Sequence, residues 1–303
     1  MNGSCFLLCL AHLLRVNVGT TTSSRWLAFC HEAVDNATKN RKRLVFMIEM
    51  PFLWGLAALV GAAVGSFITL VTHRLPLGEA IGMTRSRCPK CKHVLGLCDL
   101  MPVLSWLFAR GRCRHCHARI SMRYPLTELA CALGAVGALL LAGFTLEALA
   151  LAGLWWCVVA IFVTDLEHYI ILDEVQIALI GFGLLYHDAL GNALLPVLAS
   201  GVAGLLIGLA LKYGFLYLRQ KDGLGLGDVK LLFGVGIWLG SSIALVPFLF
   251  FAGVLGVVCG LLWRALGHGA QFPFGPALAM ALVMGVVWPE ATQYFWQTYG
   301  VQN

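Results

Sequence analysis

The sequence predicts an all-α protein that crosses a lipid bilayer about eight times. Of the 303 residues, 59% are hydrophobic and only 12% are charged, which is too apolar for a soluble domain of this size. The apolar residues gather into runs close to the ~20 residues that span the hydrocarbon core of a bilayer. Nine Trp and 34 Gly fit as well, because Trp collects at membrane interfaces and Gly is frequent in membrane helices.

The expected helices follow one another along the chain and are interrupted by one long polar loop. The first covers 51–72 and is followed by the loop at 73–125. A membrane core over 126–296 holds the rest, expected at 126–143, 147–164, 170–187, 194–217, 229–240, 243–263 and 273–296. The segment 229–240 is short and interrupted by glycine, so we expect a partial or tilted span there.

The distribution of basic residues predicts which side of the membrane the long loop faces. Ten of the 21 Lys and Arg lie between Arg74 and Arg123, where only two acids accompany them. The positive-inside rule therefore places the 73–125 loop in the cytoplasm. The same rule explains the net charge of +6 without a nucleic-acid partner. If the spans alternate, three further connections face the same side, near 165–169, 218–228 and 264–272.

The first 46 residues do not fit this topology. If the span at 51–72 enters from outside, the basic run at 39–43 lies on the wrong side of the membrane. The apolar run at 5–14 is similar to part of a signal peptide, but it lacks a preceding basic region and a clean cleavage site. Two alternatives remain open, namely translation that begins at Met47 or Met50 and a genuine extra segment.

Two C-x-x-C pairs in the polar loop predict a metal site. Cys88 and Cys91 form the first pair, and Cys113 and Cys116 form the second. Cytoplasmic thiols stay reduced, and four thiolates make the tetrahedral set that structural zinc prefers. An iron centre or an incidental thiol cluster is the alternative. Because four protein ligands leave no position for water, we expect the metal to hold the loop together rather than to catalyse.

Other histidines and cysteines have simpler interpretations. Three loop histidines are possible substitute ligands but are expected to be solvated, namely His93, His115 and His117. Three cysteines inside apolar segments are interpreted as small hydrophobic residues, namely Cys131, Cys157 and Cys259.

Acidic residues at the ends of membrane helices are candidates for chemistry, because a charge there is costly. The candidates are Asp165, Glu167, Asp173, Glu174, Asp222 and Asp228. Taken singly, each is explained by capping a helix or pairing with a nearby Lys. Asp228 differs because it follows Gly225 and Gly227, where the backbone can approach a partner closely. The topology places Asp165 and Asp228 at one membrane face, where two carboxylates that share a proton can hydrolyse an amide.

Together with these features, a series of short motifs resembles the type IV prepilin peptidases, a family of G-x-G-D aspartyl proteases of the bacterial inner membrane. The resemblance covers about 52–296, and the motifs occur in the order of the family. They are Gly65-Ser66-Phe67, His73-Arg74-Leu75-Pro76, both C-x-x-C pairs with 102–107 between them, Arg123-Tyr124-Pro125, Asp165-Leu166 with Asp173, 225–230 and 272–276.

The resemblance implies a function for the candidate residues. Asp165 and Asp228 would cleave the short basic leader of a prepilin or pseudopilin after a glycine, at the cytoplasmic membrane face, with Asp173 as the reserve for Asp165. The family also implies methylation of the new N-terminus with S-adenosylmethionine, whose binding residues the sequence does not identify. Substrates of this kind serve type IV pili, type II secretion or DNA uptake.

The sequence departs from the family at three places, and two other functions remain to be tested. Thr69 replaces the usual Asn, 97–101 replaces a Trp-Tyr-Asp-Asn-like run, and Leu172 replaces a Pro. None of these changes either aspartate, so they weaken only the expectation of methylation. The rivals are a proton-coupled transporter that uses the same acids as a relay and a zinc-stabilised binding protein without activity. A transporter is expected to show repeats or paired broken helices, which we do not find.

Overall fold

The computed structural model describes most of the chain after residue 50. The described residues are 51–79, 81, 86–88, 90–220, 224–267, 269 and 272–288. The predictions about residues 1–46 and about Asp222 lie outside them. The chain divides into two compact units, Met1–Trp54 and Gly55–Asn303, and nearly all described residues belong to the second.

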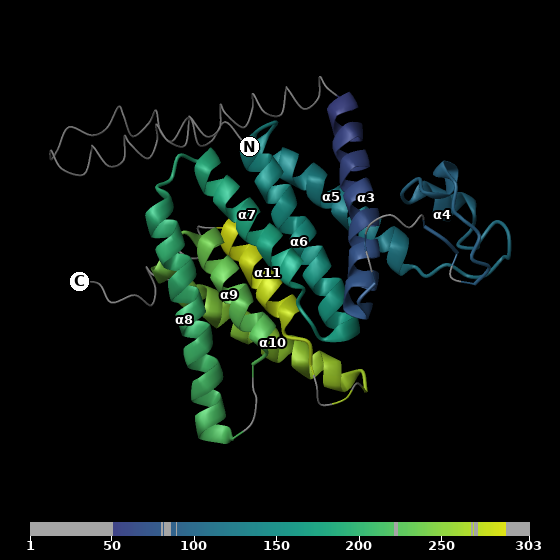
Figure 1. The fold of residues 1–303 in the computed structure, drawn as a ribbon. Helices are drawn as coiled ribbons and strands as arrows, with labels where there is room; N and C mark the ends of the chain where they lie inside the picture. Colours follow the sequence, from purple (N-terminus) through teal and green to yellow (C-terminus); the bar gives the residue numbers. More distant parts are fainter. Residues whose placement is uncertain are drawn as a thin grey trace, which may run out of the picture. The chain divides into compact units, whose positions relative to one another are not determined.

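The prediction of an all-α fold is confirmed for the described residues, which form helices and isolated bridges but no strand (Figure 1). Each of the eight predicted segments overlaps a helix, although the structure describes the last one, 273–296, only as far as residue 288. The helices are α3 (Pro51–Arg74), α5 (Arg123–Ala142), α6 (Leu146–His168), α7 (Asp173–Ala189), α8 (Leu194–Arg219), α9 (Leu226–Leu239), α10 (Leu245–Ala265) and α11 (Gly275–Val287). The polar loop adds only the short helix α4 (Leu104–Phe108).

Five helical segments of the described chain are long and apolar enough to cross a membrane. They are Pro51–Leu77, Arg123–Ala142, Leu146–His168, Leu194–Arg219 and Ser242–Ala265. The other three helices are shorter, with 17 residues in α7, 14 in α9 and 13 in α11. The predicted number of about eight spans is therefore not confirmed. The chain is a membrane protein because five such helices have no other apolar environment of sufficient thickness.

After Lys230, the short helix α9 is apolar on all sides and packs inside the bundle rather than on its surface. Such a helix is stable only when neighbouring helices surround it. Glycines allow this, because a Cβ on Gly204 of α8 or on Gly236 of α9 would collide with the backbone of the other helix. On another side, the indole N–H of Trp238 donates to the Leu179 carbonyl of α7 at 2.8 Å. These contacts hold α9, and therefore its N-terminal end, in a defined position.

The yellow helix α11 in Figure 1 lies against both α6 and α9. The buried core follows the same arrangement, because residues of all three helices contribute to it, including Ile161, Val235 and Leu278. As a result, the C-terminal end of α6 and the N-terminal ends of α9 and α11 belong to one packed unit.

Candidate active site and metal centre

Asp165 lies in the last turn of α6 and is almost fully buried. The helix ends three residues later, because Tyr169 adopts a left-handed conformation (φ 56°) and its N–H caps the Asp165 carbonyl at 3.0 Å. The side chain is 6% exposed, and its Oδ2 accepts a hydrogen bond of 2.8 Å from the N–H of Gly275. Asp165 is therefore held by a backbone donor from a distant part of the chain.

Gly275 is the first residue of α11, whose leading N–H groups have no partner within the helix. Its N–H can reach Asp165 only because the residue is glycine: a Cβ there would lie 2.8 Å from Oδ2 of Asp165. Pro276 follows, and its fixed φ favours the start of a helix at this point. The sequence shows the 272–276 motif but not the hydrogen bond from Gly275 to Asp165.

Asp228 lies in the first turn of α9, and its Oδ2 accepts a hydrogen bond of 3.3 Å from the N–H of Gly225, the residue that caps the helix. Gly227 passes close to the segment after α6, since a Cβ on it would lie 3.3 Å from Cβ of Ile171. Gln176 of α7 donates to the Gly227 carbonyl at 3.4 Å. The glycine-rich segment thus lies against Ile171, in the connection between α6 and α7, and against Gln176 of α7.

The structure brings Asp165 and Asp228 close enough to interact electrostatically. Partial burial, and then the negative charge of Asp165, raise the pKa of Asp228 to about 6, although the Gly225 N–H and Lys212 oppose this shift. A neighbouring negative charge makes it harder for both carboxylates to ionise. The pair can then present one base and one acid to a substrate.

The other candidate acids have partners or positions that separate them from this pair. Asp173 begins α7, is exposed, and accepts hydrogen bonds from Nζ of Lys230 at 2.8 and 2.9 Å. Glu174 is also exposed at the start of α7. The capping and pairing interpretation therefore describes Asp173 well.

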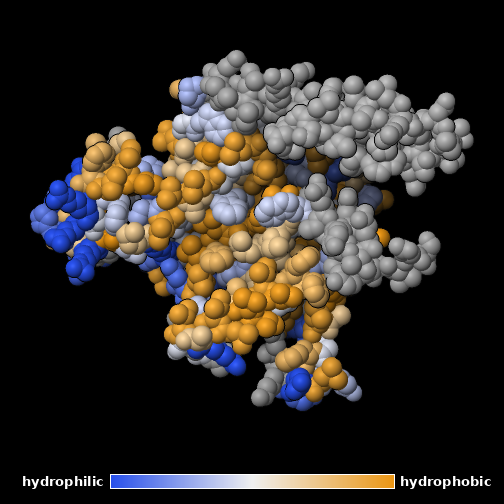
Figure 2. Space-filling view, turned by 180° about the vertical axis from the view of Figure 1, so that it is seen from behind, coloured by the Kyte–Doolittle hydropathy of each residue, from blue (hydrophilic) through white to orange (hydrophobic). Residues whose placement is uncertain are grey.

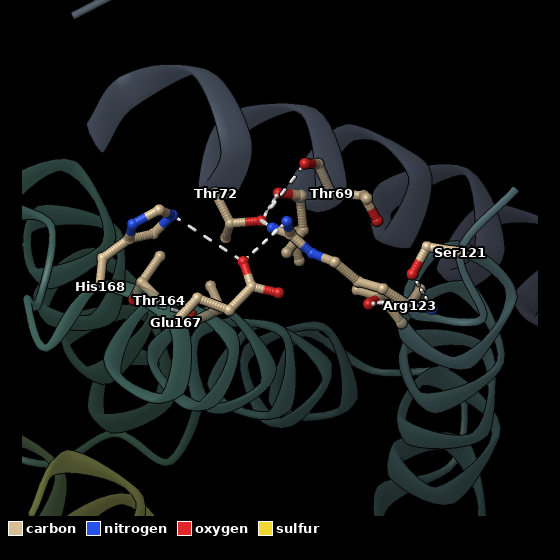
Figure 3. A network of polar contacts seen from close by, with 10 residues as sticks. Thr69, Thr72, Ser121, Arg123, Thr164, Glu167 and His168 are labelled. Atoms are coloured by element: carbon tan, nitrogen blue, oxygen red, sulfur yellow. Dashed lines mark hydrogen bonds and ion pairs between the residues drawn. The ribbon is translucent and has the colours of Figure 1, made fainter. Parts of the chain in front are cut away.

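Glu167, two residues after Asp165, joins a polar network with residues of other helices (Figure 3). Its carboxylate forms a 2.7 Å ion pair with Arg123 of α5 and lies 3.8 Å from Nε2 of His168. The same guanidinium donates to Oγ1 of Thr72 of α3 at 2.6 Å. These contacts join α3, α5 and α6 at Glu167, which lies two residues after Asp165 in the chain. The sequence pointed to Arg123 only as part of a motif, and this ion pair was not predicted.

Glu128 is a buried acid that the sequence reasoning missed. It lies within the α5 span, is 7% exposed, and its Oε2 accepts a hydrogen bond of 2.7 Å from the N–H of Val103. Val103 has φ 59°, which is unusual for a β-branched residue. The sequence could have indicated Glu128, because it is the single acid in the apolar segment that forms α5. The bond connects the polar loop directly to the membrane core.

All three departures from the family pattern lie in described positions, and the run at 97–101 begins with a short 3-10 helix over Leu97–Asp99. Thr69 is buried and donates its hydroxyl to the Gly65 carbonyl of its own helix at 2.8 Å. Leu172 has φ −68°, an angle that proline also adopts, so the backbone at this position is unchanged by the departure. Neither residue contacts the carboxylates through a hydrogen bond that the structure records.

Each C-x-x-C pair forms the same compact turn. The N–H of Lys92 donates to the Cys88 carbonyl at 2.9 Å, and the N–H of His117 donates to the Cys113 carbonyl at 2.9 Å. Lys92 and His117 occupy equivalent positions and both have a left-handed backbone, with φ 57° and 55°. The two turns therefore present their thiols in matching ways.

The four thiols of Cys88, Cys91, Cys113 and Cys116 lie within 4.8 Å of one another, so they could hold a metal ion. The Sγ atoms of Cys88 and Cys116 are 3.8 Å apart. Zn–S bonds of about 2.3 Å in a tetrahedron require nearly this separation. Backbone hydrogen bonds, above all from Cys91, lower the pKa of Cys88 to about 6, so this thiol loses its proton easily.

The remaining loop histidines and core cysteines agree with their simpler interpretations. His93, His115 and His117 are exposed and are not part of the metal-binding group, and the rings of His93 and His115 lie 3.6 Å apart. Cys131 and Cys157 are buried inside helices and unpaired.

Comparison with known proteins finds similarity over most of the chain. Residues 59–142 match the family described as "Bacterial Peptidase A24 N-terminal domain", and residues 151–261 match the "Type IV leader peptidase family". Several relatives carry the name prepilin leader peptidase/N-methyltransferase. The protein from Aeromonas hydrophila is 33% identical over 282 residues, which cover 82% of this chain and 96% of the relative.

Relatives from other bacteria have the same name. The protein from Stutzerimonas stutzeri is 33% identical over 273 residues and covers 81% of this chain and 94% of its own length. The protein from Burkholderia pseudomallei (strain K96243) is 36% identical over 253 residues, which cover 74% of this chain and 81% of the relative. No solved structure gives a significant match.

Proposed function

Because this chain belongs to the type IV leader peptidase family, we propose that it cleaves prepilin leaders with the carboxylates of Asp165 and Asp228. The observation that carries this assignment is electrostatic. The two acids come from different helices, yet the charge of Asp165 contributes to raising the pKa of Asp228 to about 6. An aspartic peptidase needs two carboxylates that differ in their readiness to ionise, so that one acts as base and the other as acid.

The hydrogen bonds of the two acids suggest different roles. Asp165 accepts from the Gly275 N–H at the positive end of α11, and such a donor stabilises a carboxylate more than a carboxylic acid. We assign it as the base that takes a proton from the attacking water. Asp228, whose pKa of about 6 leaves a larger protonated fraction near neutral pH than an ordinary carboxyl has, is assigned as the acid that donates to the substrate carbonyl oxygen.

The reaction then balances within the pair. The water oxygen bonds to the scissile carbonyl carbon, its proton goes to Asp165, and the carbonyl oxygen receives the proton of Asp228. When the tetrahedral intermediate collapses, the C–N bond breaks, the proton on Asp165 passes to the leaving amine, and Asp228 recovers its own proton. No covalent link to the protein is needed, because water is the nucleophile.

The metal centre has a separate role in this proposal. Cys88, Cys91, Cys113 and Cys116 would hold zinc, because they offer four thiolates at tetrahedral spacing. Bound zinc would supply a fixed cross-link between the two turns of the loop. An iron centre would need the same thiols and is distinguished by metal analysis.

Placement and the second activity complete the proposal. The 73–125 loop and the aspartates are placed at the cytoplasmic face of a bacterial inner membrane, since the basic residues concentrate there. The relatives are also named N-methyltransferases, so methylation of the new N-terminus with S-adenosylmethionine is the expected second step. Pseudopilins are included in the proposed substrate class.

Incubation of the purified full chain with a prepilin that retains its leader tests the proposal. With S-adenosylmethionine present, mass spectrometry should find the mature pilin with one added methyl group. Without it, the mature pilin should appear unmethylated. An intact prepilin after incubation with metal-loaded protein would reject the peptidase assignment and return the transporter and binding-protein alternatives. Cleavage without methylation under both conditions would restrict the activity to peptide hydrolysis.

A further inference from the structure

The polar loop carries a cluster of exposed apolar side chains that the described residues leave uncovered. We call it the apolar cluster, and it consists of Leu100, Met101, Leu104, Leu107 and Phe108. Leu107 is 61% exposed and Phe108 is 76% exposed. Leu104, Leu107 and Phe108 share one face of α4, because residues three and four apart are neighbours on a helix. Adjacent apolar side chains of this size on a surface indicate an interaction site.

The opposite face of α4 is already used to hold the loop together. The Trp106 ring lies against Gly111, where a Cβ would come within 2.7 Å of it, and its indole N–H donates to the Ile120 carbonyl at 3.3 Å. Trp106 thus joins α4 to the second metal-binding turn. Since the inward face is occupied by this packing, the apolar cluster is not the interior of the loop.

A hydrogen bond places the start of α4 beside a membrane span. The Val103 N–H, just before α4, donates to Glu128 at 2.7 Å. Glu128 lies within the Arg123–Ala142 span, about 7.5 Å along the helix from Arg123 at a rise of ~1.5 Å per residue. The loop is also continuous with spans at both ends, Pro51–Leu77 and Arg123–Ala142. The apolar cluster therefore begins beside the N-terminal part of the α5 span.

Basic residues follow the apolar cluster directly. Arg110, Arg112 and Arg114 are exposed and line a shallow hollow together with His117. Arg114 forms a 3.3 Å ion pair with Asp99, whereas no acid among the residues that the structure describes pairs with Arg110 or Arg112. Figure 2 shows strongly hydrophilic and hydrophobic surfaces side by side on the part of the molecule that carries α4. Apolar side chains bordered by arginine are the pattern of segments that bind anionic lipid surfaces.

We infer that the apolar cluster inserts into the bilayer surface, with Arg110 and Arg112 against the headgroups of anionic lipids. The hydrogen bond to Glu128 favours lipid over a protein partner, because it fixes the cluster beside a helix that itself enters the bilayer. The excess of positive charge favours anionic over neutral headgroups. This inference does not depend on the roles of Asp165 and Asp228.

Photo-cross-linking in the full chain tests the inference. Phe108→p-benzoylphenylalanine is introduced, the protein is reconstituted in nanodiscs of phosphatidylcholine with or without about 30% phosphatidylglycerol, and adducts are identified by mass spectrometry after irradiation. Because Phe108 is largely exposed, the substitution does not disturb packing. The matched control is Arg119→p-benzoylphenylalanine, an exposed position of the same loop outside the apolar cluster and outside both metal-binding turns.

The expected result is a several-fold higher yield of lipid adducts at position 108 than at position 119, with a further increase in the nanodiscs that contain phosphatidylglycerol. Arg110→Glu combined with Arg112→Glu should remove that increase. Equal yields at the two positions would overturn the inference. Adducts to added prepilin in place of lipid would identify a protein-docking surface instead. If phosphatidylglycerol still increased the yield of lipid adducts in the charge-reversed variant, Arg110 and Arg112 would not be the residues that contact the anionic headgroups.

Discussion

The metal-binding loop and the aspartate site bring together distant residues by different means. In the loop, each pair of thiols is arranged by its own short turn, through bonds such as that from the Lys92 N–H to the Cys88 carbonyl. At the aspartate site, α6 supplies Asp165, α9 supplies Asp228, and α11 supplies the Gly275 N–H that orients the first acid. Local hydrogen bonds prepare the thiols, whereas only helix packing assembles the aspartates.

This difference predicts different consequences of substitution. Removing a thiol removes a ligand that would hold two local turns together, so the structure of the loop should suffer first. Removing a carboxylate leaves the packing of α6, α9 and α11 in place, so chemistry should suffer without loss of the fold. The predictions below test that separation, in order of decreasing effect.

Asp165→Asn and Asp228→Asn should each abolish prepilin cleavage, with a loss of roughly 10²–10⁴-fold or more, since Asn cannot exchange the catalytic proton. The rate of prepilin cleavage measures this. The double variant should be no worse than either single one, because residues that act as a unit lose their effect together. Metal content should not change.

The matched control for this pair is Asp173→Asn, which removes an exposed partner of Lys230 and should retain part of the activity. Asp222→Asn is expected to do the same. Near-normal cleavage by either the Asp165 or the Asp228 variant would contradict the assigned pair, and Asp173 would then replace Asp165 as the candidate.

Gly275→Ala should lower cleavage by about 10²-fold, a typical cost of displacing a catalytic group by about 1 Å. The added methyl would lie 2.8 Å from Asp165 Oδ2 and would push the carboxylate from its position. Gly253→Ala is the control, because a Cβ there has no neighbour within 4 Å. Equal activity of both variants would show that the Gly275 contact does not position Asp165.

Cys88→Ser and Cys113→Ser should lower bound zinc below the expected ratio of about one per chain and destabilise the loop. Metal analysis and limited proteolysis within 73–125 measure the two effects. Cys98→Ser is the control, since Cys98 is exposed and outside the group of four thiols. Full zinc occupancy in the double variant would reject the assigned ligands.

Asp228→Asn should stabilise the protein at neutral pH even though it is inactive. The pKa of Asp228 rises from its usual 3.8 to about 6 on folding, so the folded state binds this proton more tightly than the unfolded state. Ionised Asp228 therefore opposes folding above pH 6, and this penalty disappears as the pH falls toward 4. Each pKa unit corresponds to ~1.4 kcal/mol, and partial exposure reduces the total to about 1–2 kcal/mol.

Thermal unfolding in detergent at pH 7.5 and pH 4.5 measures this effect. The Asn variant should have the higher midpoint at pH 7.5, and the difference from the parent should shrink at pH 4.5. The exposed Asp173→Asn change should show no such pattern. If the unfolding midpoints of the variant and the parent differed equally at pH 7.5 and pH 4.5, the charge of Asp228 would not oppose folding.

The sequence by itself determined the helices, the paired thiols and the two aspartates that now form the candidate site. Apolar runs identify helices because a bilayer or a helix bundle requires them, and this signal lies within each segment. The C-x-x-C spacing is also local, since one short turn brings both thiols to the same side. Asp165 and Asp228 were reached less directly, through charge distribution and then through the resemblance to a family.

Only the tertiary structure decided how these parts meet. The bond from Gly275 to Asp165, the bond from Val103 to Glu128 and the ion pair between Arg123 and Glu167 join segments far apart in the chain. Hydropathy cannot reveal these contacts, because nearly every residue has a backbone N–H and the sequence does not show which distant acceptor it will meet after packing. The lengths of α7, α9 and α11 were decided in the same way, since helices surrounded by neighbours need not cross the whole bilayer.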